Sequence, residues 1–159
     1  MPRLLLISYF FPPHGGAGVQ RALKFCTAAA EQGWQVTVLA NAPRAGDLQD
    51  PTMLGEIPPE VTVVRTGSLP LHQLGPWVRK AAAPDVYLGW YPTALKAARL
   101  QLEAQPCDAI LSTSMPYTAH LVAQTLKQDL GLPWLADLRY FEDGRVLLRP
   151  LSGGRLVTR

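Results

Sequence analysis

The stretch that decides the fold is LLLISYFFPPHGGAGVQR, residues 4–21. Its first four residues form a continuous apolar run, which is typical of a strand covered on both faces in a parallel sheet. Prolines and glycines follow, as far as Gly18. From Val19 to Ala30 apolar residues recur at helical spacing, and Gly33 ends the pattern. The stretch therefore predicts a buried strand, a tight glycine turn and an amphipathic helix.

The same alternation of strand and helix patterns continues along the chain. Further strands are expected at residues 34–40, 61–64, 109–111 and 134–136, and further helices at residues 91–102 and 116–130. Strands that alternate with helices in this way predict an α/β fold: a Rossmann-like, doubly wound parallel sheet with right-handed crossovers. We expect one such domain over residues 1–139. Residues 140–159 carry arginines and glycines with little periodicity, which predicts an irregular or poorly ordered tail.

Composition narrows the class of protein. The chain has 159 residues, of which 48% are hydrophobic and 17% charged, as in ordinary globular domains. The 15 lysines and arginines are scattered along it, whereas nucleic-acid-binding proteins gather such charge on one face. No apolar run approaches the ~20 residues of a membrane-spanning helix. We therefore expect a cytoplasmic protein with at most peripheral contact at the inner face of the membrane, no nucleic-acid partner, no metal and no cofactor.

The first candidate site is the glycine turn that follows the first strand. Gly15, Gly16 and Gly18 let the backbone turn sharply and approach a bound group at the N-terminus of the next helix. A diphosphate suits such a position, because unpaired amides and the helix dipole both favour an anion. The alternative is that a strand-to-helix turn needs glycine in any case. The spacing matches neither the dinucleotide-binding nor the P-loop pattern.

A second candidate site is the hydroxyl-rich stretch that begins at Ser112. Ser114 could simply cap the following helix, which leaves Tyr117 and the other hydroxyls free to bind a polar ligand. His120 falls on the polar side of that helix in its first turn. Spacing alone slightly favours a solvated surface histidine over one that faces the binding crevice.

Asp137 and Arg139 lie two residues apart at the end of the last strand, so they point to the same face if the strand continues. They could pair with each other. They could equally present a carboxylate and a guanidinium to a ligand.

Taken together, residues 4–21, 31–39, 85–98, 112–120 and 131–139 resemble family-4 glycosyltransferases, particularly those that build bacterial surface polysaccharides. The resemblance implies the N-terminal, acceptor-side half of a two-domain GT-B enzyme that is metal-independent and retains anomeric configuration. It implies a nucleotide-sugar donor with its diphosphate at the glycine loop, and a polysaccharide, glycan or lipid-linked acceptor. The site residues that it suggests are Asp137, Arg139 and His120 for catalysis, and Gly15, Gly16, Gly18, His14, Arg21, Ser114 and Tyr117 for substrate binding.

The chain also departs from the family pattern. The donor half carries a pair of glutamates in the pattern E-x7-E, and Glu103 and Glu142 are too far apart to form one. The family pattern at the last strand resembles D-F-R-D-x-W, whereas residues 137–141 read DLRYF. We therefore expect a truncated or frame-shifted acceptor-side portion that is inactive alone. The alternative is a stand-alone nucleotide- or phosphate-binding Rossmann module, or a subunit of a split glycosyltransferase completed by a separate donor domain.

Overall fold

A computed structural model describes residues 1–71 and 85–138 of the chain. Within these residues the chain forms a single α/β domain around a parallel sheet of five strands in the order β3-β2-β1-β4-β5. The strands are β1 Arg3–Ile7, β2 Gln35–Asn41, β3 Thr62–Thr66, β4 Ala109–Thr113 and β5 Trp134–Asp137. The prediction of a Rossmann-like, doubly wound parallel sheet is confirmed.

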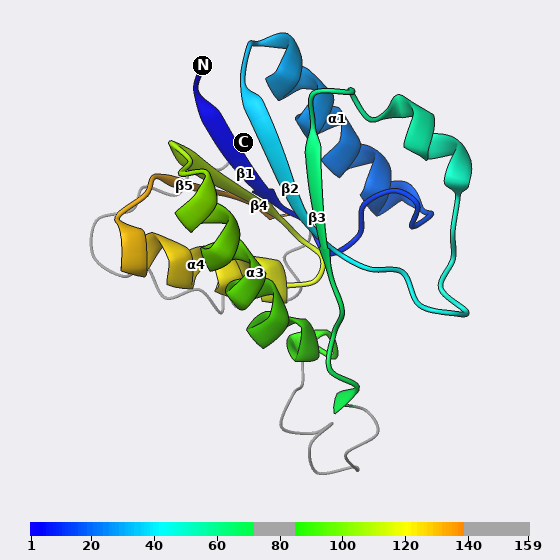
Figure 1. The fold of residues 1–159 in the computed structure, drawn as a ribbon. Helices are drawn as coiled ribbons and strands as arrows, with labels where there is room; N and C mark the ends of the chain where they lie inside the picture. The colour runs from blue at the N-terminus through cyan, green and yellow to red at the C-terminus, as the bar shows by residue number, and fades with distance from the viewer. Residues whose placement is uncertain (72–84, 139–159) are drawn as a thin grey trace.

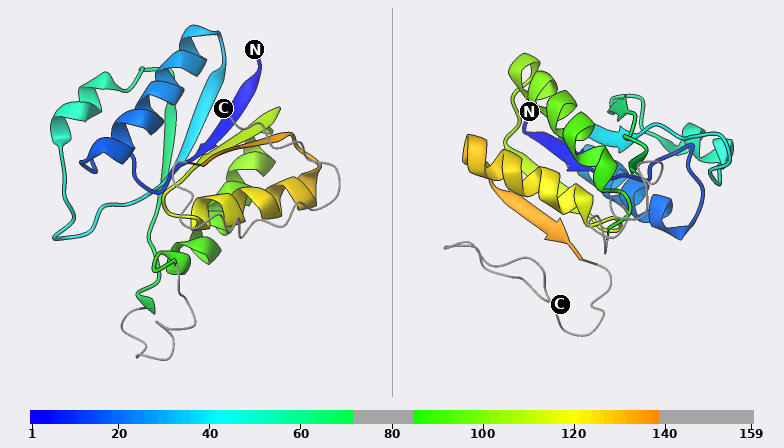
Figure 2. Two further views of the ribbon diagram at one scale, coloured as in Figure 1. Left: turned by 180° about the vertical axis from the view of Figure 1, so that it is seen from behind. Right: turned by 90° about the horizontal axis from the view of Figure 1, so that it is seen from below.

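Helices cover both faces of this sheet (Figures 1 and 2). The α-helices are α1 Ala17–Glu31, α3 Tyr91–Ala104 and α4 Thr118–Leu130, and the short 3-10 helices are η1 Pro51–Glu56 and η3 Leu88–Trp90. Helix α1 packs on one face, and α3 and α4 pack side by side on the other. This is the layer arrangement that buries both sides of a parallel sheet.

Strand β1 lies at the centre of the sheet and separates two hydrophobic clusters. Leu6 packs with the residues of α1, whereas Ile7 packs with those of α3 and α4, and neither is exposed to solvent. Successive side chains of a strand point to opposite faces, so a strand with helices on both sides needs apolar residues at every position. This arrangement accounts for the continuous apolar run from Leu4.

Four of the five described strands extend further at their carboxyl ends than the hydrophobic pattern predicts, whereas β1 ends at Ile7 as expected. Strand β4 includes Ser112 and Thr113, which lie in register with Ala136 and Asp137 of β5. These buried hydroxyls are tolerated because they are hydrogen-bonded, that of Ser112 to His120 and Trp134 and that of Thr113 to Asp137. The connection between β2 and β3 contains η1, whose first turn is capped by the Asp50 carboxylate accepting from the Thr52 amide at 3.1 Å.

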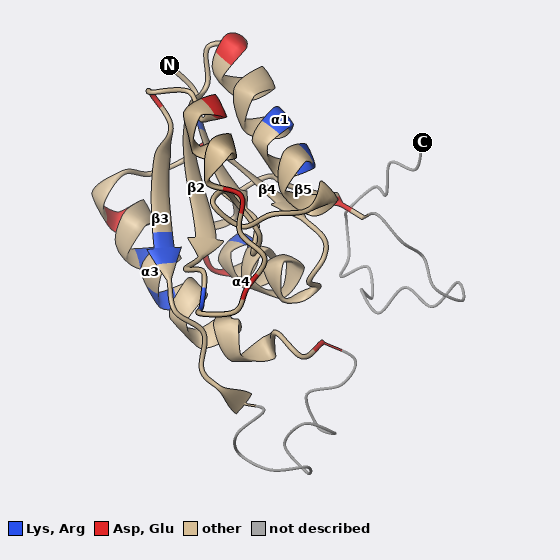
Figure 3. Cartoon of the chain, turned by 90° about the vertical axis from the view of Figure 1, so that its right-hand side faces the viewer, with Lys and Arg blue, Asp and Glu red and all other residues tan. Residues whose placement is uncertain are grey.

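Basic and acidic residues are distributed over several helices, strands and loops of the described chain (Figure 3). Neither sign gathers over one element in this view. No helix in residues 1–71 and 85–138 is long and apolar enough to cross a membrane. The predicted tail at residues 140–159, and Arg139 before it, lie outside the described residues.

Candidate functional site

The strand order places a change of direction between β1 and β4. The chain leaves β1 towards α1 on one face of the sheet and leaves β4 towards α4 on the other, so the loops after these neighbouring strands diverge. In an open α/β sheet, ligands bind in the crevice at this switch point, outside the carboxyl ends of the strands. The glycine loop and the stretch from Ser112 to His120 flank this point.

Gly16 takes a backbone conformation that only glycine adopts readily. It lies at the N-cap position of α1 with φ 103° and ψ 164°, and it is exposed. In this region a side chain would be strained, although a Cβ atom would meet no atom within 4 Å. No side chain caps α1 among the described residues. The first turn of α1 contains no acidic residue, and the positive end of the helix dipole lies at the switch point.

The amide of the neighbouring Gly15 is already hydrogen-bonded within the protein. The Gly15 amide donates to the Leu48 carbonyl at 2.8 Å, and the Asp50 amide donates to the Pro13 carbonyl at 2.7 Å. A Cβ atom on Gly15 would lie 3.0 Å from Cγ of Leu48. The expectation of unpaired amides along the turn is therefore wrong at Gly15, because the segment before η1 pairs with it.

His14 is buried inside the same loop. Its Nδ1 lies 3.2 Å from the Phe11 carbonyl oxygen, which can only accept, so Nδ1 carries a proton. Its Nε2 lies 3.5 Å from the Asp47 carboxylate, and its ring makes an edge contact with Phe10. The backbone of His14 forms an isolated bridge with Gln49, so the glycine loop is joined to the segment that follows β2.

An ion pair joins α1 to the carboxyl end of β5. Nε and Nη2 of Arg21 donate to the two carboxylate oxygens of Asp137 at 2.9 and 2.5 Å. The Thr113 hydroxyl donates to the same carboxylate at 2.8 Å. The Asp137 side chain is 11% exposed and that of Arg21 is 52% exposed. The bond to Asp137 raises the pKa of Arg21. Asp137 therefore pairs with Arg21, and the alternative pairing with Arg139 falls on a residue outside the described ranges.

Ser114 does not cap α4. Its amide and its hydroxyl both donate to the Asp137 carbonyl, at 3.0 and 3.2 Å, and so they join β4 to β5. Helix α4 starts at Thr118, after Tyr117 at the N-cap position. Its cap is supplied by Asp85, whose carboxylate accepts from the Thr118 amide at 2.5 Å and from the Thr118 hydroxyl at 2.7 Å. Sequence reasoning missed Asp85, because a cap is sought beside the helix and this residue lies 33 positions earlier.

His120 is completely buried, so the interpretation as a solvated surface histidine is wrong. Its Nδ1 lies 2.7 Å from the Ser112 hydroxyl, which also accepts from the indole N–H of Trp134 at 2.8 Å. Burial lowers the pKa of His120 to about 4, although the charges of Asp137 and Asp85 oppose the shift. The helical pattern failed here because the sheet beneath the first turn of α4 offers polar side chains as well as apolar ones.

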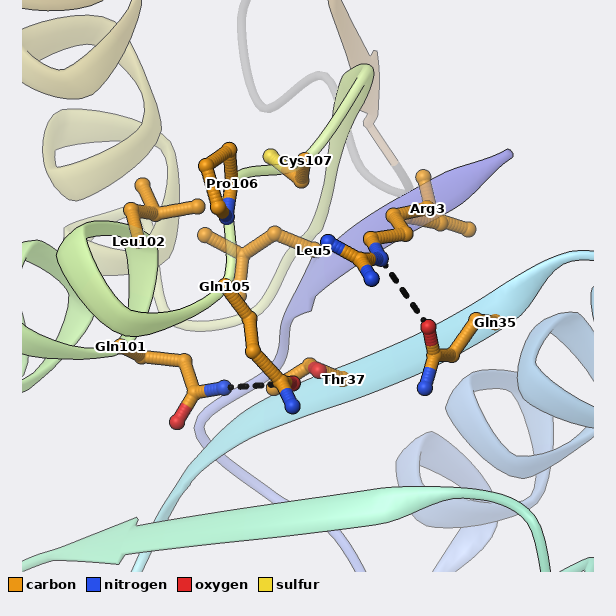
Figure 4. A pocket seen from close by; sticks show the side chains of 10 residues that line it. Arg3, Leu5, Gln35, Thr37, Gln101, Leu102, Gln105, Pro106 and Cys107 are labelled. Carbon is orange, nitrogen blue, oxygen red and sulfur yellow. Dashed lines mark hydrogen bonds between the residues drawn. The ribbon is translucent and has the colours of Figure 1, made fainter. Parts of the chain in front are cut away.

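A small hollow lies near the amino ends of β1 and β2, at the end of these strands opposite to the switch point (Figure 4). Among its lining residues, Arg3 is hydrogen-bonded to Gln35 and Gln101 to Gln105. Its volume of about 10 Å³ is close to that of one water molecule. The hollow is too small for a substrate, so the loops at the switch point remain the candidate site.

Comparison with known proteins supports the fold. UGT2 of Phytolacca americana, complexed with UDP-2fluoro-glucose and pterostilbene, matches with a TM-score of 0.57 and 15% identity over 86% of this chain and 30% of that one. SsfS6, a Streptomyces sp. SF2575 glycosyltransferase, matches with a TM-score of 0.53 and 19% identity over 87% of this chain and 39% of that one. LpCGTa in complex with UDP matches with a TM-score of 0.54 and 16% identity over 85% of this chain and 30% of that one.

This chain has the fold of one Rossmann-like half of a GT-B glycosyltransferase. No protein-family model and no curated protein matches it. This chain covers less than two fifths of the length of each neighbour described above. At these identities the likeness establishes the fold and leaves the glycosyltransferase family open.

Proposed function

We propose that the chain is the N-terminal, acceptor-side portion of a retaining glycosyltransferase of the family-4 kind, inactive without a donor-binding half. It would serve transfer of a sugar from a nucleotide-sugar donor to a polysaccharide, glycan or lipid-linked acceptor. The observation that carries the proposal is the N-terminus of α1, with Gly16 at its N-cap and no acidic residue in its first turn, at the switch point of a GT-B-like sheet and next to the Arg21–Asp137 pair.

The charges at the carboxyl ends of the strands suit the binding of a diphosphate from solvent. The dipole of α1 and the half-exposed Arg21 guanidinium provide positive charge, and Asp137 holds that guanidinium at the carboxyl edge of the sheet. A phosphate oxygen could accept from other N–H groups of Arg21 while Nε and Nη2 stay bonded to Asp137. The ion pair would then remain intact. Two of the neighbours carry UDP or a UDP-sugar analogue, which makes a nucleoside diphosphate the natural probe.

The other proposed site residues have separate roles. Ser114 and Tyr117 lie on the loop between β4 and α4 and would contact the acceptor or the transferred sugar. His120 would act in catalysis together with Asp137, and His14 would support the glycine loop from within the protein. We keep Arg139 as a candidate for the catalytic set on the basis of the sequence resemblance.

The test is calorimetric titration of the chain with UDP, GDP and ADP. We expect weak, salt-sensitive binding of at least one of them, weakened several-fold in Arg21→Gln. Arg99→Gln is the matched control, because Arg99 is also half-exposed and paired with one carboxylate, that of Asp129 on the far side of the molecule. Equal loss in both variants, or no binding by the folded wild-type chain, would argue against a diphosphate at this edge.

Turnover is measured separately. The isolated chain should release no nucleoside diphosphate from sugar nucleotides, and adding a donor-side GT-B half that carries the E-x7-E pair should restore release. Release by the isolated chain above the Arg21→Gln background would contradict the expected inactivity. Binding of nucleoside diphosphates without turnover in either format would favour the alternative of a stand-alone phosphate-binding module.

A further inference from the structure

Arg65 joins the edge strand β3 to the glycine loop. Its Nη2 donates to the carbonyl oxygen of Pro12, in the first half of the loop that follows β1. Strand β2 lies between them, and neighbouring strands are about 4.8 Å apart, so the loop is roughly 10 Å from β3. Ala40, in register with Arg65 on β2, has a side chain small enough for the long arginine side chain to pass over it. Arg65 therefore links the loop to a strand that is not a neighbour of β1 in the sheet.

The first half of the glycine loop depends on donors from elsewhere in the chain. Pro12 and Pro13 have no N–H group, so their backbone can form hydrogen bonds only through the carbonyl oxygens. The Pro13 carbonyl accepts from the Asp50 amide at 2.7 Å. Arg65 supplies the donor for Pro12, which is a buried residue. Without the guanidinium, the Pro12 carbonyl would lose the only partner that the described residues give it.

The second half of the loop is open to solvent. Gly16 and Ala17 at the start of α1 are exposed, whereas Phe11, Pro12 and His14 are buried. A buried half that is fixed by hydrogen bonds determines how the exposed half leaves the sheet. The anchor at Pro12 therefore acts on the start of α1 without touching it.

The guanidinium of Arg65 has no counter-charge in the described part of the chain. Arg21 and Arg99 each pair with a carboxylate, whereas none pairs with Arg65 within residues 1–71 and 85–138. Partial burial lowers the pKa of Arg65, although an arginine remains charged at neutral pH. Its Nη1 is shielded from solvent and has no hydrogen-bond partner among the described residues. The hydrogen bond that offsets the cost of this partly buried charge goes to the glycine loop.

From these contacts we infer that Arg65 is a positioning residue of the glycine loop. Through the Pro12 carbonyl it fixes the conformation in which the start of α1 receives a diphosphate. The effect on the ligand rests on the proposed function, whereas the anchoring of the loop does not. Arg65 contacts Pro12 rather than the ligand, so its effect on affinity is indirect.

The primary test is hydrogen exchange of single amides, followed by NMR in the chain without ligand. In Arg65→Met the amides of His14, Gly15 and Asp50, whose hydrogen bonds hold the loop, should exchange roughly tenfold faster, because the lost bond joins a charged donor to a carbonyl. Arg65→Lys keeps a cationic donor and should recover most of the protection. Val63→Ala is the matched control, because Val63 lies two residues earlier on the same face of β3 and packs against the α1 cluster. Unchanged loop amides in folded Arg65→Met, or equal acceleration in Val63→Ala, overturn the inference.

A measurement on the wild-type chain covers the case in which Arg65→Met does not fold. In protein labelled with 15N-arginine, the Nη protons of Arg65 should be resolved and should exchange slowly with water, as expected of a hydrogen-bonded and shielded group. The signals are assigned by their loss in Arg65→Lys. Averaged Nη signals that exchange rapidly overturn the anchor.

Titration with UDP connects the anchor to binding. We expect Arg65→Met to weaken binding several-fold, Arg65→Lys to restore it, and Val63→Ala to leave it unchanged. Wild-type affinity in Arg65→Met, despite faster exchange of the loop amides, overturns the positioning role. An anchored loop in a wild-type chain that does not bind UDP supports the anchor and counts against the proposed function alone.

Discussion

At Gly89 the backbone of η3 passes directly over the carbonyl group of Leu69. The Leu69 amide donates to the Gly89 carbonyl at 2.9 Å, and a Cβ atom on Gly89 would lie far inside the contact distance of the Leu69 oxygen. The atom in the way belongs to the backbone, so it cannot turn aside as a flexible side chain can. Glycine at this position is therefore needed for the close approach of two chain segments.

Gly89→Ala should lower the free energy of unfolding by about 1–3 kcal/mol through overpacking. Urea unfolding followed by circular dichroism measures this change. Gly67→Ala is the control, since a Cβ atom there would meet no atom within 4 Å. Equal stability of the two variants would rule out the steric explanation.

The ion pairs of the molecule differ in burial. Asp137 is 11% exposed where it meets Arg21, whereas Asp129 is 39% exposed where it meets Arg99. A double-mutant cycle with Arg21→Gln and Asp137→Asn should give a coupling energy of about 1 kcal/mol. The same cycle on Arg99 and Asp129 should give a few tenths of that, because water screens the exposed pair. A larger coupling for the exposed pair would contradict this ranking.

At the scale of elements, α4 is attached to the sheet through polar as well as apolar contacts. Ala119, Val122 and Leu126 pack into the cluster shared with α3. The first turn is held by the Asp85 cap and by the hydrogen bond between His120 and Ser112. Acidification should therefore loosen this helix before it disturbs the apolar core.

The pH dependence has a definite sign. The pKa of His120 is lowered from 6.5 to about 4, so the unfolded chain binds a proton more readily than the folded one. The corresponding stability is fully present above pH 6.5 and is lost as the pH falls towards 4, by up to about 3 kcal/mol. Unfolding free energies measured at several pH values should show that the wild type loses more stability than His120→Gln over this window. Parallel curves for the two proteins would refute the assignment to His120.

At the scale of the whole molecule, the sheet has a protected centre and two edges. Strands β1, β2 and β4 each pair on both sides, whereas β3 and β5 each pair on one side among the described residues. Leu135 of β5 is 61% exposed. Opening an edge strand breaks fewer contacts than opening a central one.

Native-state hydrogen exchange should therefore rank the strands. Amides of β1 should exchange most slowly, close to the rate set by global unfolding, and those of β5 should exchange faster. The same experiment with the donor-side half added should slow exchange only where the two halves meet. Amides of β5 that are as slow as those of β1 in the isolated chain would mean that the edge is covered.

The sequence by itself determined the class of fold, the number of strands in the described part and the place of the glycine turn. It could do so because these depend on local periodicity: a run of apolar residues from Leu4, helical spacing after Gly18, and the return of the same pattern along the chain. The order of the strands came from the tertiary structure, because right-handed crossovers are compatible with several orders.

Only the tertiary structure decided which polar groups meet. Arg21 and Asp137 are 116 positions apart, and Asp85 caps a helix that begins 33 positions later. The Leu48 carbonyl, in another loop, accepts from the Gly15 amide. His120 has the sequence environment of a surface residue and is buried by partners on two different strands. Hydrogen bonds depend on distance in space, and periodicity along one element carries no information about the side chains that another element brings to it.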